Sequence, residues 1–349
     1  MKQIKIFLIE HQPAFSKMLF AEISRHQDLV LVGRSATLYE AQTRIFRLKP
    51  DVVLLDLDLP HADVASFLEM LVRHSSVPVI VTGSRAPESR RKVLEALEGG
   101  AVEAVSKPLH SPEFGEEAPS LADKIRGAAG ISSPSPPAGP KAIPPPRSPS
   151  LLPSMERGLH KLVALGASTG GTRALEWLLP RIPLPCPPVV LVQHMPAAFT
   201  ADFARRLDSL GPLEVREARH GDAAAPGVVL VAPGNVHMKV RRPGLRYTVA
   251  LEEGPPESGH RPSVDVLFRS VAACARGDAV GVLLTGMGRD GARGLLEIRR
   301  AGGKTLVQDE KTSVVFGMPG EALALGAAGQ VAPLQSIPSA ILRMVADEL

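Results

Sequence analysis

Apolar runs alternate with amphipathic stretches along the first 127 residues of the chain. The apolar runs are rich in Val, Ile and Leu, as buried strands of a parallel sheet are. We expect such strands at 4–9, 29–33, 51–56, 77–83 and 101–107. Apolar residues at helical spacing predict helices at 14–26, 37–48, 63–74, 88–98 and 111–127. This alternation predicts an α/β domain, a doubly wound parallel sheet with helices on both faces.

A second α/β pattern begins at residue 159 and continues to the end of the chain. Its strands are predicted at 161–167, 188–194, 213–217, 228–233, 237–242, 245–253, 279–286 and 304–309. Its helices are predicted at 172–179, 197–210, 263–277, 292–302, near 319–326 and at 336–349. The three strands within 228–253 follow one another with short breaks, so we expect an antiparallel meander added to an otherwise parallel sheet.

Proline and serine dominate residues 128–158, where no apolar period remains. A segment of this composition cannot bury a core and is typical of a semi-rigid linker. The chain is therefore expected to contain a first domain at 1–127, a linker at 128–158 and a second domain at 159–349.

Composition narrows the class of protein. Hydrophobic residues make up 44% of the 349 residues and charged residues 22%, which suits globular domains. The net charge of +4 is small for this length and does not favour nucleic-acid binding. Cys186 and Cys274 lie far apart and form no disulfide or zinc pattern. No apolar run reaches the roughly 18 residues of a membrane span, so we expect a cytoplasmic protein without one.

Groups that suit a cation and a phosphoryl group follow the predicted strands of the first domain. They are Glu10, His11, Asp56, Asp58, Thr82 and Lys107. Because the carboxyl ends of parallel strands share one edge of a sheet, these side chains should lie close together. Carboxylate oxygens suit Mg²⁺, a carboxylate can accept a phosphoryl group, and a lysine can neutralise the added charge. Any one of them alone could equally be a solvated strand-end residue.

The order of these residues resembles a two-component receiver domain over residues 1–127. The resemblance implies that Asp56 is the phosphorylated aspartate and that Thr82 and Lys107 contact the phosphoryl group. It also implies that Glu10, together with Asp56, holds Mg²⁺. The second residue of the family's acidic pair is His11 here, and a neutral imidazole is a poor ligand for Mg²⁺. Metal-dependent phosphorylation is therefore in question unless Asp58 turns toward the pocket.

Ser168, His194 and Asp290 follow three predicted strands of the second domain. A serine, a histidine and an aspartate at neighbouring strand ends can act together in acyl transfer. Ser168 would attack the acyl carbon, His194 would move the proton, and Asp290 would orient the imidazole. Backbone N–H groups near Thr169 and Met287, in the two glycine turns, could stabilise the developing oxyanion.

The glycine turn GASTGG has other interpretations. Ser168 could be an ordinary cap of the helix that follows, or the turn could bind a phosphate at that helix. The turn lacks the lysine of a P-loop and the spacing of G-x-G-x-x-G. The chain order Ser, His, Asp also differs from the order in the α/β-hydrolases.

Longer motifs of the second domain resemble the catalytic domain of the CheB family of chemotaxis protein-glutamate methylesterases. The motifs are GASTGG, QHMP, HRPSVDVLFRS, VLLTGMGRDGA and QDEKTSVVFGMPGEA. The resemblance implies hydrolysis of glutamate methyl esters on chemoreceptors, deamidation of receptor glutamines and gating by a receiver that a CheA-type histidine kinase phosphorylates. It assigns Ser168, His194 and Asp290 to the triad and places Thr169 and Met287 at the oxyanion, with no cofactor for the esterase. The alternative is a chemosensory docking protein whose degenerate receiver is not switched by phosphorylation.

Overall fold

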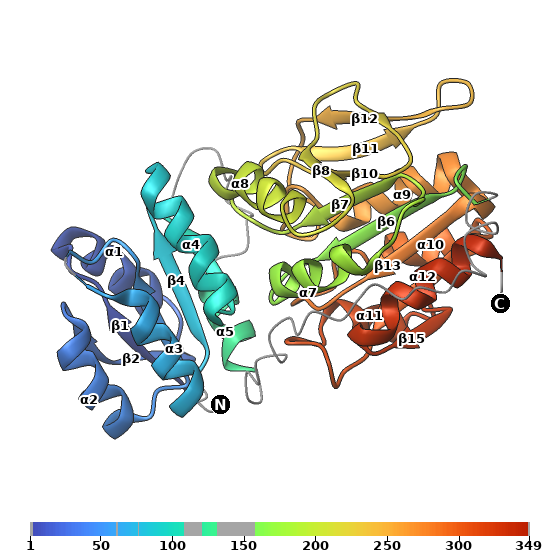
Figure 1. The fold of residues 1–349 in the computed structure, drawn as a ribbon. Helices are drawn as coiled ribbons and strands as arrows, with labels where there is room; N and C mark the ends of the chain where they lie inside the picture. The colour runs from blue at the N-terminus through green and yellow to red at the C-terminus, as the bar shows by residue number, and fades with distance from the viewer. Residues whose placement is uncertain (1–2, 61, 76, 108–120, 131–157, 348–349) are drawn as a thin grey trace. The chain divides into compact units, whose positions relative to one another are not determined.

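The structure is a computed structural model, which describes residues 3–60, 62–75, 77–107, 121–130 and 158–347 (Figure 1). The chain divides into two compact units, residues 1–139 and 140–349. Most of the predicted linker lies outside the described residues; its first two positions belong to a helix that ends at Ala129. None of the helices in the described ranges is long and apolar enough to cross a membrane.

The first unit is built on a five-stranded parallel sheet with strand order β2-β1-β3-β4-β5. The strands are β1 (Ile4–Ile9), β2 (Leu29–Ser35), β3 (Val52–Asp56), β4 (Val79–Gly83) and β5 (Glu103–Ser106). Every residue of β3 and β4 is buried, because both faces of the sheet are covered. The strands confirm the five predicted segments, with small differences at their ends.

Helices connect the strands of this sheet. They are α1 (Pro13–Ser24), α2 (Leu38–Leu48), α3 (Val64–His74), α4 (Pro87–Gly99) and α5 (Leu121–Ala129). Helix α1 packs beside α5, and α3 packs beside α4. The last predicted helix began at residue 111, but α5 starts at Leu121, and residues 111–120 lie outside the described residues.

The second unit contains a seven-stranded parallel sheet with strand order β15-β14-β13-β6-β7-β10-β8. The strands are β6 (Leu162–Ala167), β7 (Val189–Gln193), β8 (Glu214–Glu217), β10 (Val228–Val231), β13 (Ala279–Leu283), β14 (Lys304–Gln308) and β15 (Gln330–Ala332). The chain order reverses at β6, which lies between β7 and β13. Ligand sites in open parallel sheets form beyond the carboxyl ends of the strands at such a reversal.

The predicted three-stranded meander is wrong in part. Strand β10 belongs to the parallel sheet, whereas β11 (His237–Arg241) and β12 (Tyr247–Glu252) pair with short β9 (Ala223–Ala224) in a separate antiparallel sheet. The sequence of β10, VVLV, is apolar throughout and suits a strand covered on both faces. The strands β9 and β15 were not predicted, because runs as short as AA and QVA carry no apolar period.

Helices α7 (Gly171–Leu178), α8 (Ala197–Asp208), α9 (Val264–Ala275), α10 (Ala292–Arg300), α11 (Met318–Ala324) and α12 (Ile337–Ala346) complete this unit. Short 3₁₀ turns lie at Leu179–Arg181, Arg276–Asp278 and Leu334–Ser336. Helix α9 contacts β6, β7 and β13 of the parallel sheet and also β11 of the antiparallel sheet. The core between the two sheets therefore fixes α9, whose first residues lie at the strand ends where the predicted catalytic residues gather.

Candidate active site

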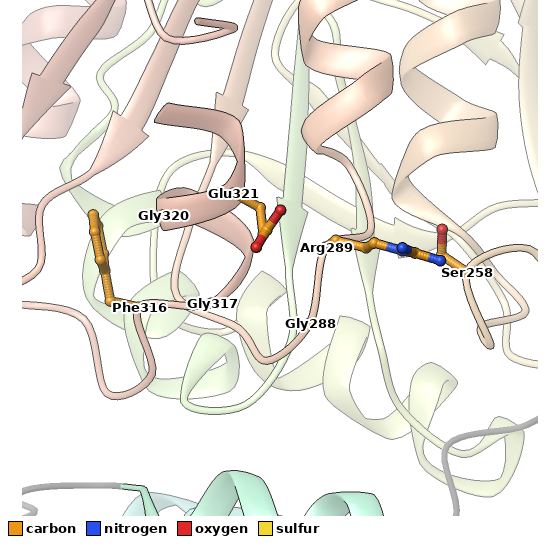
Figure 2. A pocket seen from close by; sticks show the side chains of 7 residues that line it. All are labelled: Ser258, Gly288, Arg289, Phe316, Gly317, Gly320 and Glu321. Atoms are coloured by element: carbon orange, nitrogen blue, oxygen red, sulfur yellow. The ribbon is translucent and has the colours of Figure 1, made fainter. Parts of the chain in front are cut away.

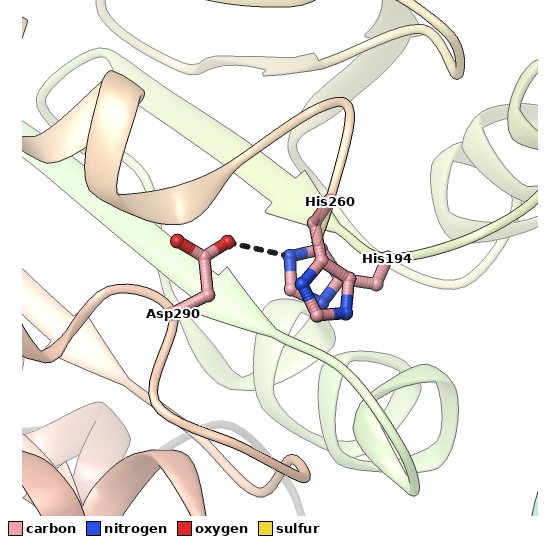
Figure 3. Close-up of side chains that lie close together, drawn as sticks. All are labelled: His194, His260 and Asp290. Atoms are coloured by element: carbon pink, nitrogen blue, oxygen red, sulfur yellow. Dashed lines mark hydrogen bonds and ion pairs between the residues drawn. The ribbon is translucent and has the colours of Figure 1, made fainter. Parts of the chain in front are cut away.

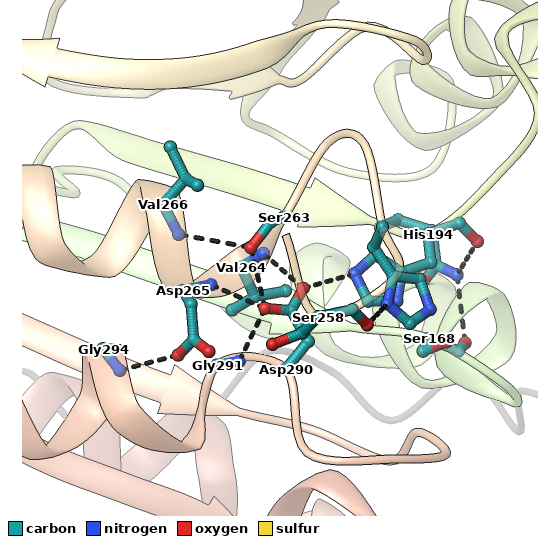
Figure 4. Close-up of polar contacts among 12 residues, drawn as sticks. Ser168, His194, Ser258, Ser263, Val264, Asp265, Val266, Asp290, Gly291 and Gly294 are labelled. Carbon is teal, nitrogen blue, oxygen red and sulfur yellow. Dashed lines mark hydrogen bonds and ion pairs between the residues drawn. The ribbon is translucent and has the colours of Figure 1, made fainter. Parts of the chain in front are cut away.

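Ser168 lies directly after β6, at the centre of the parallel sheet. Its backbone N–H donates to Thr285 O across the end of β13 at 3.0 Å. On the other side, the backbone N–H of His194 donates to Ala167 O at 3.0 Å. Residues from three neighbouring strand ends are therefore joined, and Figure 4 shows Ser168 and His194 next to each other. Ser168 is buried, with 7% of its surface exposed.

The glycine turn after Ser168 begins helix α7. Gly170 is the residue before the helix and has a φ of 78°, a conformation that favours glycine. The helix has no side-chain cap, so the interpretation of Ser168 as a helix cap is wrong. Ser168 instead uses its backbone carbonyl, which accepts from Gly171 N at 2.7 Å. Its side chain is therefore not committed to holding the helix.

His194 and Asp290 form a hydrogen bond across two strand ends (Figure 3). The Nε2 atom of His194 lies 2.8 Å from Asp290 Oδ2. An ionised carboxylate can only accept, so Nε2 carries the proton of a neutral ring and Nδ1 is the basic nitrogen. The Nδ1 atom is buried. The imidazole therefore has the tautomer that a proton shuttle needs, with Nδ1 as the atom that takes the proton.

Asp290 is fully buried and accepts hydrogen bonds at both oxygens (Figure 4). Besides His194, its donors are Ser263 Oγ at 2.7 Å and the backbone N–H groups of Val264, Asp265 and Gly291 at 2.7, 3.0 and 3.1 Å. Two of these N–H groups belong to the first turn of α9, where a helix favours a negative charge. Burial raises the pKa of the Asp290 carboxyl, and the donors and the nearby His260 oppose that rise.

A second buried carboxylate lies behind Asp290. Asp265, in the first turn of α9, accepts from the backbone N–H of Gly294 in α10 at 2.7 Å. Asp290 lies just before α10 and accepts hydrogen bonds from the first turn of α9, whereas Asp265 lies in α9 and accepts one from α10. Each carboxylate therefore binds the amino-terminal turn of the neighbouring helix. Burial, together with the charge of Asp290, raises the pKa of Asp265 to about 6. These reciprocal hydrogen bonds fix the angle between α9 and α10 and therefore the position of Asp290.

His260 covers the open face of the His194 ring (Figure 3). The two rings are stacked, with their centroids 3.6 Å apart and an angle of 11° between their planes. The Nδ1–H group of His260 donates to Ser258 O at 2.8 Å, which holds the ring in place. The stacked ring limits rotation of His194 and therefore supports the orientation set by Asp290.

Gln193 joins the nucleophile turn to the histidine loop. Its side-chain NH₂ donates to Ser168 O and to His194 O, each at 3.0 Å. The side chain is 3% exposed, so water cannot replace these bonds easily. The sequence did not indicate this role, because a glutamine at a strand end carries no signal of what it will bind. The same holds for Ser263, whose place before an apolar helix signals a cap but not a bond to Asp290.

Thr169 and Met287, the residues predicted at the oxyanion, lie in the two turns beside Ser168. Thr285 Oγ1 donates to Thr169 O at 3.0 Å, which orients the first turn. Within the described ranges, the backbone N–H of Met287 makes no hydrogen bond. The N–H of Ser168 is engaged with Thr285 O. Met287 N–H is therefore a donor that could serve an incoming oxygen, whereas Ser168 N–H is not.

A cavity of about 520 Å³ lies next to these turns (Figure 2). Its lining residues are Ser258, Gly288, Arg289, Phe316, Gly317, Gly320 and Glu321. Gly288 follows Met287, and Ser258 O accepts from His260, so the cavity lies beside the turn predicted at the oxyanion and beside the ring that covers His194. A Cβ atom on Gly286, two residues before Gly288, would lie 2.8 Å from Ser168 Cβ, so this turn packs tightly against the serine. Arg289 and Glu321 bring opposite charges to its walls.

In the first unit, the predicted phosphorylation site lies at the carboxyl ends of β1, β3 and β5. Asp56 is 1% exposed, and its Oδ1 accepts from Lys107 Nζ at 2.6 Å and from Asp58 N at 2.9 Å. His11 Nδ1 lies 2.8 Å from Asp56 Oδ2, and Lys107 Nζ lies 3.0 Å from Glu10 Oε2. The structure therefore brings Glu10, His11, Asp56 and Lys107 together. Thr82 is also close in register, since it pairs with Asp56 across β3 and β4.

The Mg²⁺ site implied by the receiver resemblance fits this pocket poorly. Asp58, the residue considered as a replacement for the missing acid, accepts from the backbone N–H of Ser84 at 3.0 Å. The potential ligand atoms within 4.8 Å of one another come from Glu10, His11 and Asp56. An imidazole nitrogen thus stands where an all-oxygen Mg²⁺ site would have a carboxylate.

Comparisons with known proteins agree with both units. The family model described as CheB methylesterase matches residues 163–341, and that described as response regulator receiver domain matches residues 6–118. The chain is 42% identical to a "Protein-glutamate methylesterase/protein-glutamine glutaminase 2" of Syntrophus aciditrophicus, over 99% of this chain and 100% of that protein. It is 43% identical to a "Protein-glutamate methylesterase/protein-glutamine glutaminase" of Bordetella bronchiseptica, over 99% of each.

The second unit is also similar to a solved structure, the Thermotoga maritima CheB methylesterase catalytic domain. The sequence identity is 37% and the TM-score 0.52, over 53% of this chain and 98% of that chain. The match covers about the length of the seven-stranded unit. Fold and sequence therefore agree on the same relatives.

Proposed function

The chain belongs to the CheB methylesterase family and carries a response regulator receiver domain, and on this premise we propose how its two sites work. The second unit is a protein-glutamate methylesterase and protein-glutamine glutaminase. The observation that supports the catalytic assignment best is the 2.8 Å bond between His194 Nε2 and Asp290, together with the place of Ser168 next to His194 in Figure 4. The docking alternative offers no reason for a buried carboxylate that orients a histidine next to a serine.

The first half of the reaction forms an acyl-enzyme. Ser168 Oγ attacks the side-chain carbonyl carbon of a methylated glutamate, and its proton passes to His194 Nδ1. The tetrahedral intermediate collapses, the C–O bond to the methoxy group breaks, and His194 returns the proton to the leaving group as methanol forms. Asp290 stabilises the positively charged imidazole throughout.

The second half releases the product. Water attacks the acyl carbon, His194 takes a proton from the water, and Ser168 Oγ leaves with that proton restored. The product is a glutamate side chain. With a glutamine substrate the same steps release ammonia in place of methanol, because an amide nitrogen that accepts the proton leaves in the same way.

The oxyanion of each tetrahedral intermediate needs hydrogen-bond donors. We assign this role to the backbone N–H groups of Thr169 and Met287, which flank the nucleophile from two turns. One such donor typically contributes about 3–4 kcal/mol to the transition state. No metal is needed, because serine, histidine and these donors supply the nucleophile, the proton transfer and the charge stabilisation.

The substrates of the family are chemoreceptors, and we propose that a receptor segment enters the 520 Å³ cavity beside Met287. Arg289 and Glu321 would then contact polar side chains that flank the reacting glutamate. The first unit would regulate access. A histidine kinase of the pathway would phosphorylate Asp56, and Thr82 and Lys107 would contact the phosphoryl group.

Methanol release from a methylated receptor tests the catalytic proposal. Ser168→Ala should lower the rate at least about 10⁴-fold, because it removes the nucleophile. Ser336→Ala is a matched control, since Ser336 is exposed before α12 and its side chain makes no capping bond. Equal rates for wild type and Ser168→Ala would refute the serine mechanism.

A further inference from the structure

Glu10 and Asp56 each divide their two oxygens between Lys107 and His11. Lys107 Nζ lies 2.6 Å from Asp56 Oδ1 and 3.0 Å from Glu10 Oε2. His11 Nδ1 faces the other oxygen of each acid, Asp56 Oδ2 at 2.8 Å and Glu10 Oε1 at 3.6 Å. One imidazole nitrogen and two carboxylate oxygens therefore form a three-atom face on the side away from the lysine.

The spacing of these three atoms suits a metal ion. Ligand atoms that lie about 2.1 Å from a metal are about 3.0–3.4 Å from one another in octahedral or tetrahedral geometry. His11 Nδ1 lies 2.8 and 3.6 Å from the two oxygens, which brackets that range, and the three atoms all lie within 4.8 Å of one another. An ion at this face would replace the Nδ1 proton that Asp56 Oδ2 accepts. The His11 side chain is 27% exposed, so an ion can reach the face from solvent.

The charge of the pocket also favours a cation. Both acids are buried, and Lys107 supplies only one positive charge for their two negative ones. A divalent ion on the open face would remove this imbalance.

The chemistry of the ligand set decides which ion. Mg²⁺ prefers oxygen ligands, whereas imidazole suits the later first-row transition metals, whose affinity for such sites rises from Mn²⁺ to Co²⁺ and beyond. We propose that Glu10, His11 and Asp56 form a site for a divalent transition-metal ion, and that His11 turns the preference of this receiver away from Mg²⁺.

Metal titration of the full-length, chelator-treated protein tests the proposal. Mn²⁺ binding is followed by electron paramagnetic resonance, Co²⁺ binding by its visible absorption, and Mg²⁺ binding by competition with Mn²⁺. The wild type should bind Co²⁺ and Mn²⁺ more tightly than Mg²⁺ by more than about tenfold. His11→Asp should reduce the preference for Co²⁺ over Mg²⁺ more than about tenfold, because it removes the imidazole and restores an all-oxygen set.

Two controls make the assignment specific. His74→Asp makes the same chemical change at an exposed position of α3 and should leave binding unchanged. His194, His260 and Asp290 form a second group of potential ligands, so the titrations are repeated in a His260→Ala background, which disrupts that group. Should His11→Asp fail to fold by circular dichroism, His11→Asn replaces it and should lose Co²⁺ binding. The proposal would be overturned if the wild type bound neither Mn²⁺ nor Co²⁺, or if it preferred Mg²⁺. It would also be overturned if substitution of His11 left Co²⁺ binding unchanged.

Discussion

Each unit of this protein holds a histidine 2.8 Å from a buried aspartate at the carboxyl edge of a parallel sheet. In one unit the pair is His194 Nε2 with Asp290, and in the other it is His11 Nδ1 with Asp56. Both aspartates are at most 1% exposed. The two pairs therefore share their distance and the burial of the aspartate, whereas the His11 side chain is 27% exposed and that of His194 8%.

The surroundings of the aspartates are opposite in kind. Asp290 is held by three backbone N–H groups and a serine hydroxyl, and within the described ranges no lysine or arginine pairs with it. Asp56 is held by the ammonium group of Lys107 at 2.6 Å. Backbone N–H groups are neutral, so they hold the carboxylate in place while its net charge stays at −1. That charge can then stabilise a positively charged imidazole. An ammonium group neutralises the carboxylate instead.

The histidines differ in their neighbours too. His194 is stacked on His260 and lies beside Ser168, which can give it a proton. His11 lies between two carboxylates and faces no hydroxyl in the contacts described. A histidine–aspartate pair is thus not by itself a sign of acyl transfer. The third group decides whether the pair moves a proton or holds a cation.

The largest effect is expected from Asp290→Asn, which removes the charge from the aspartate of the His194–Asp290 pair. The amide keeps the shape of the carboxylate but turns one acceptor into a donor that faces other donors. We expect the rate of methanol release to fall about 10⁴-fold, because the imidazole loses the acceptor that sets its tautomer. Asp63→Asn is the control, since Asp63 caps α3 through Ser66 N at 3.0 Å and asparagine caps equally well. Near-normal activity of Asp290→Asn would show that backbone and stacking contacts suffice to orient His194.

A smaller effect is expected from Gln193→Leu. Leucine keeps most of the volume but removes both bonds that join Ser168 O to His194 O. A displacement of about 1 Å between nucleophile and base can cost about 100-fold, so we expect kcat to fall about 10- to 100-fold with little change in KM. Gln335→Leu, at an exposed position of the same unit, should leave both constants unchanged. A rise in KM alone would assign Gln193 to substrate binding instead.

The smallest effect concerns the carboxylate behind Asp290. The pKa of Asp265 is raised to about 6 by burial and by Asp290, whereas in the unfolded chain it is near 3.8. Between these values Asp265 binds more protons in the folded state, so its contribution to the free energy of unfolding should decrease as the pH rises from about 4 to 6 and stay lower above that. Asp265→Asn should remove this decrease, on the order of 1–3 kcal/mol.

Chemical denaturation of wild type and Asp265→Asn at pH 4, 6 and 8 measures this change. Asparagine can still accept from Gly294 N, so the helix contact is retained. The wild type should lose stability relative to Asp265→Asn between pH 4 and 6. If the wild type gains stability relative to Asp265→Asn over this range, the prediction is wrong and Asp265 is stabilised as an anion. In that case the carboxylates of the second unit would need a charge partner, as Asp56 does in the first unit, although their contacts show mainly backbone donors.

The sequence by itself determined most of the strands and helices of both units. Apolar period is a local property, so runs such as Ile4–Ile9 and Val52–Asp56 could be assigned from neighbouring residues alone. The order of reactive residues at strand ends also predicted which side chains would meet. Strand β10 was assigned to the wrong sheet, because closeness in sequence suggested a meander while burial on both faces placed it in the parallel sheet.

Only the tertiary structure decided how the grouped residues bind one another. It selected Nε2 of His194 for Asp290, the hydroxyl of Ser263 and the start of α9 as the donors around that carboxylate, and Gln193 as the bridge to Ser168. It also paired His11 with Asp56 and turned Asp58 toward Ser84. Hydrogen bonds depend on the direction and distance of groups far apart in the chain. A pattern of residue types does not contain that information until the sheets and helix α9 are packed.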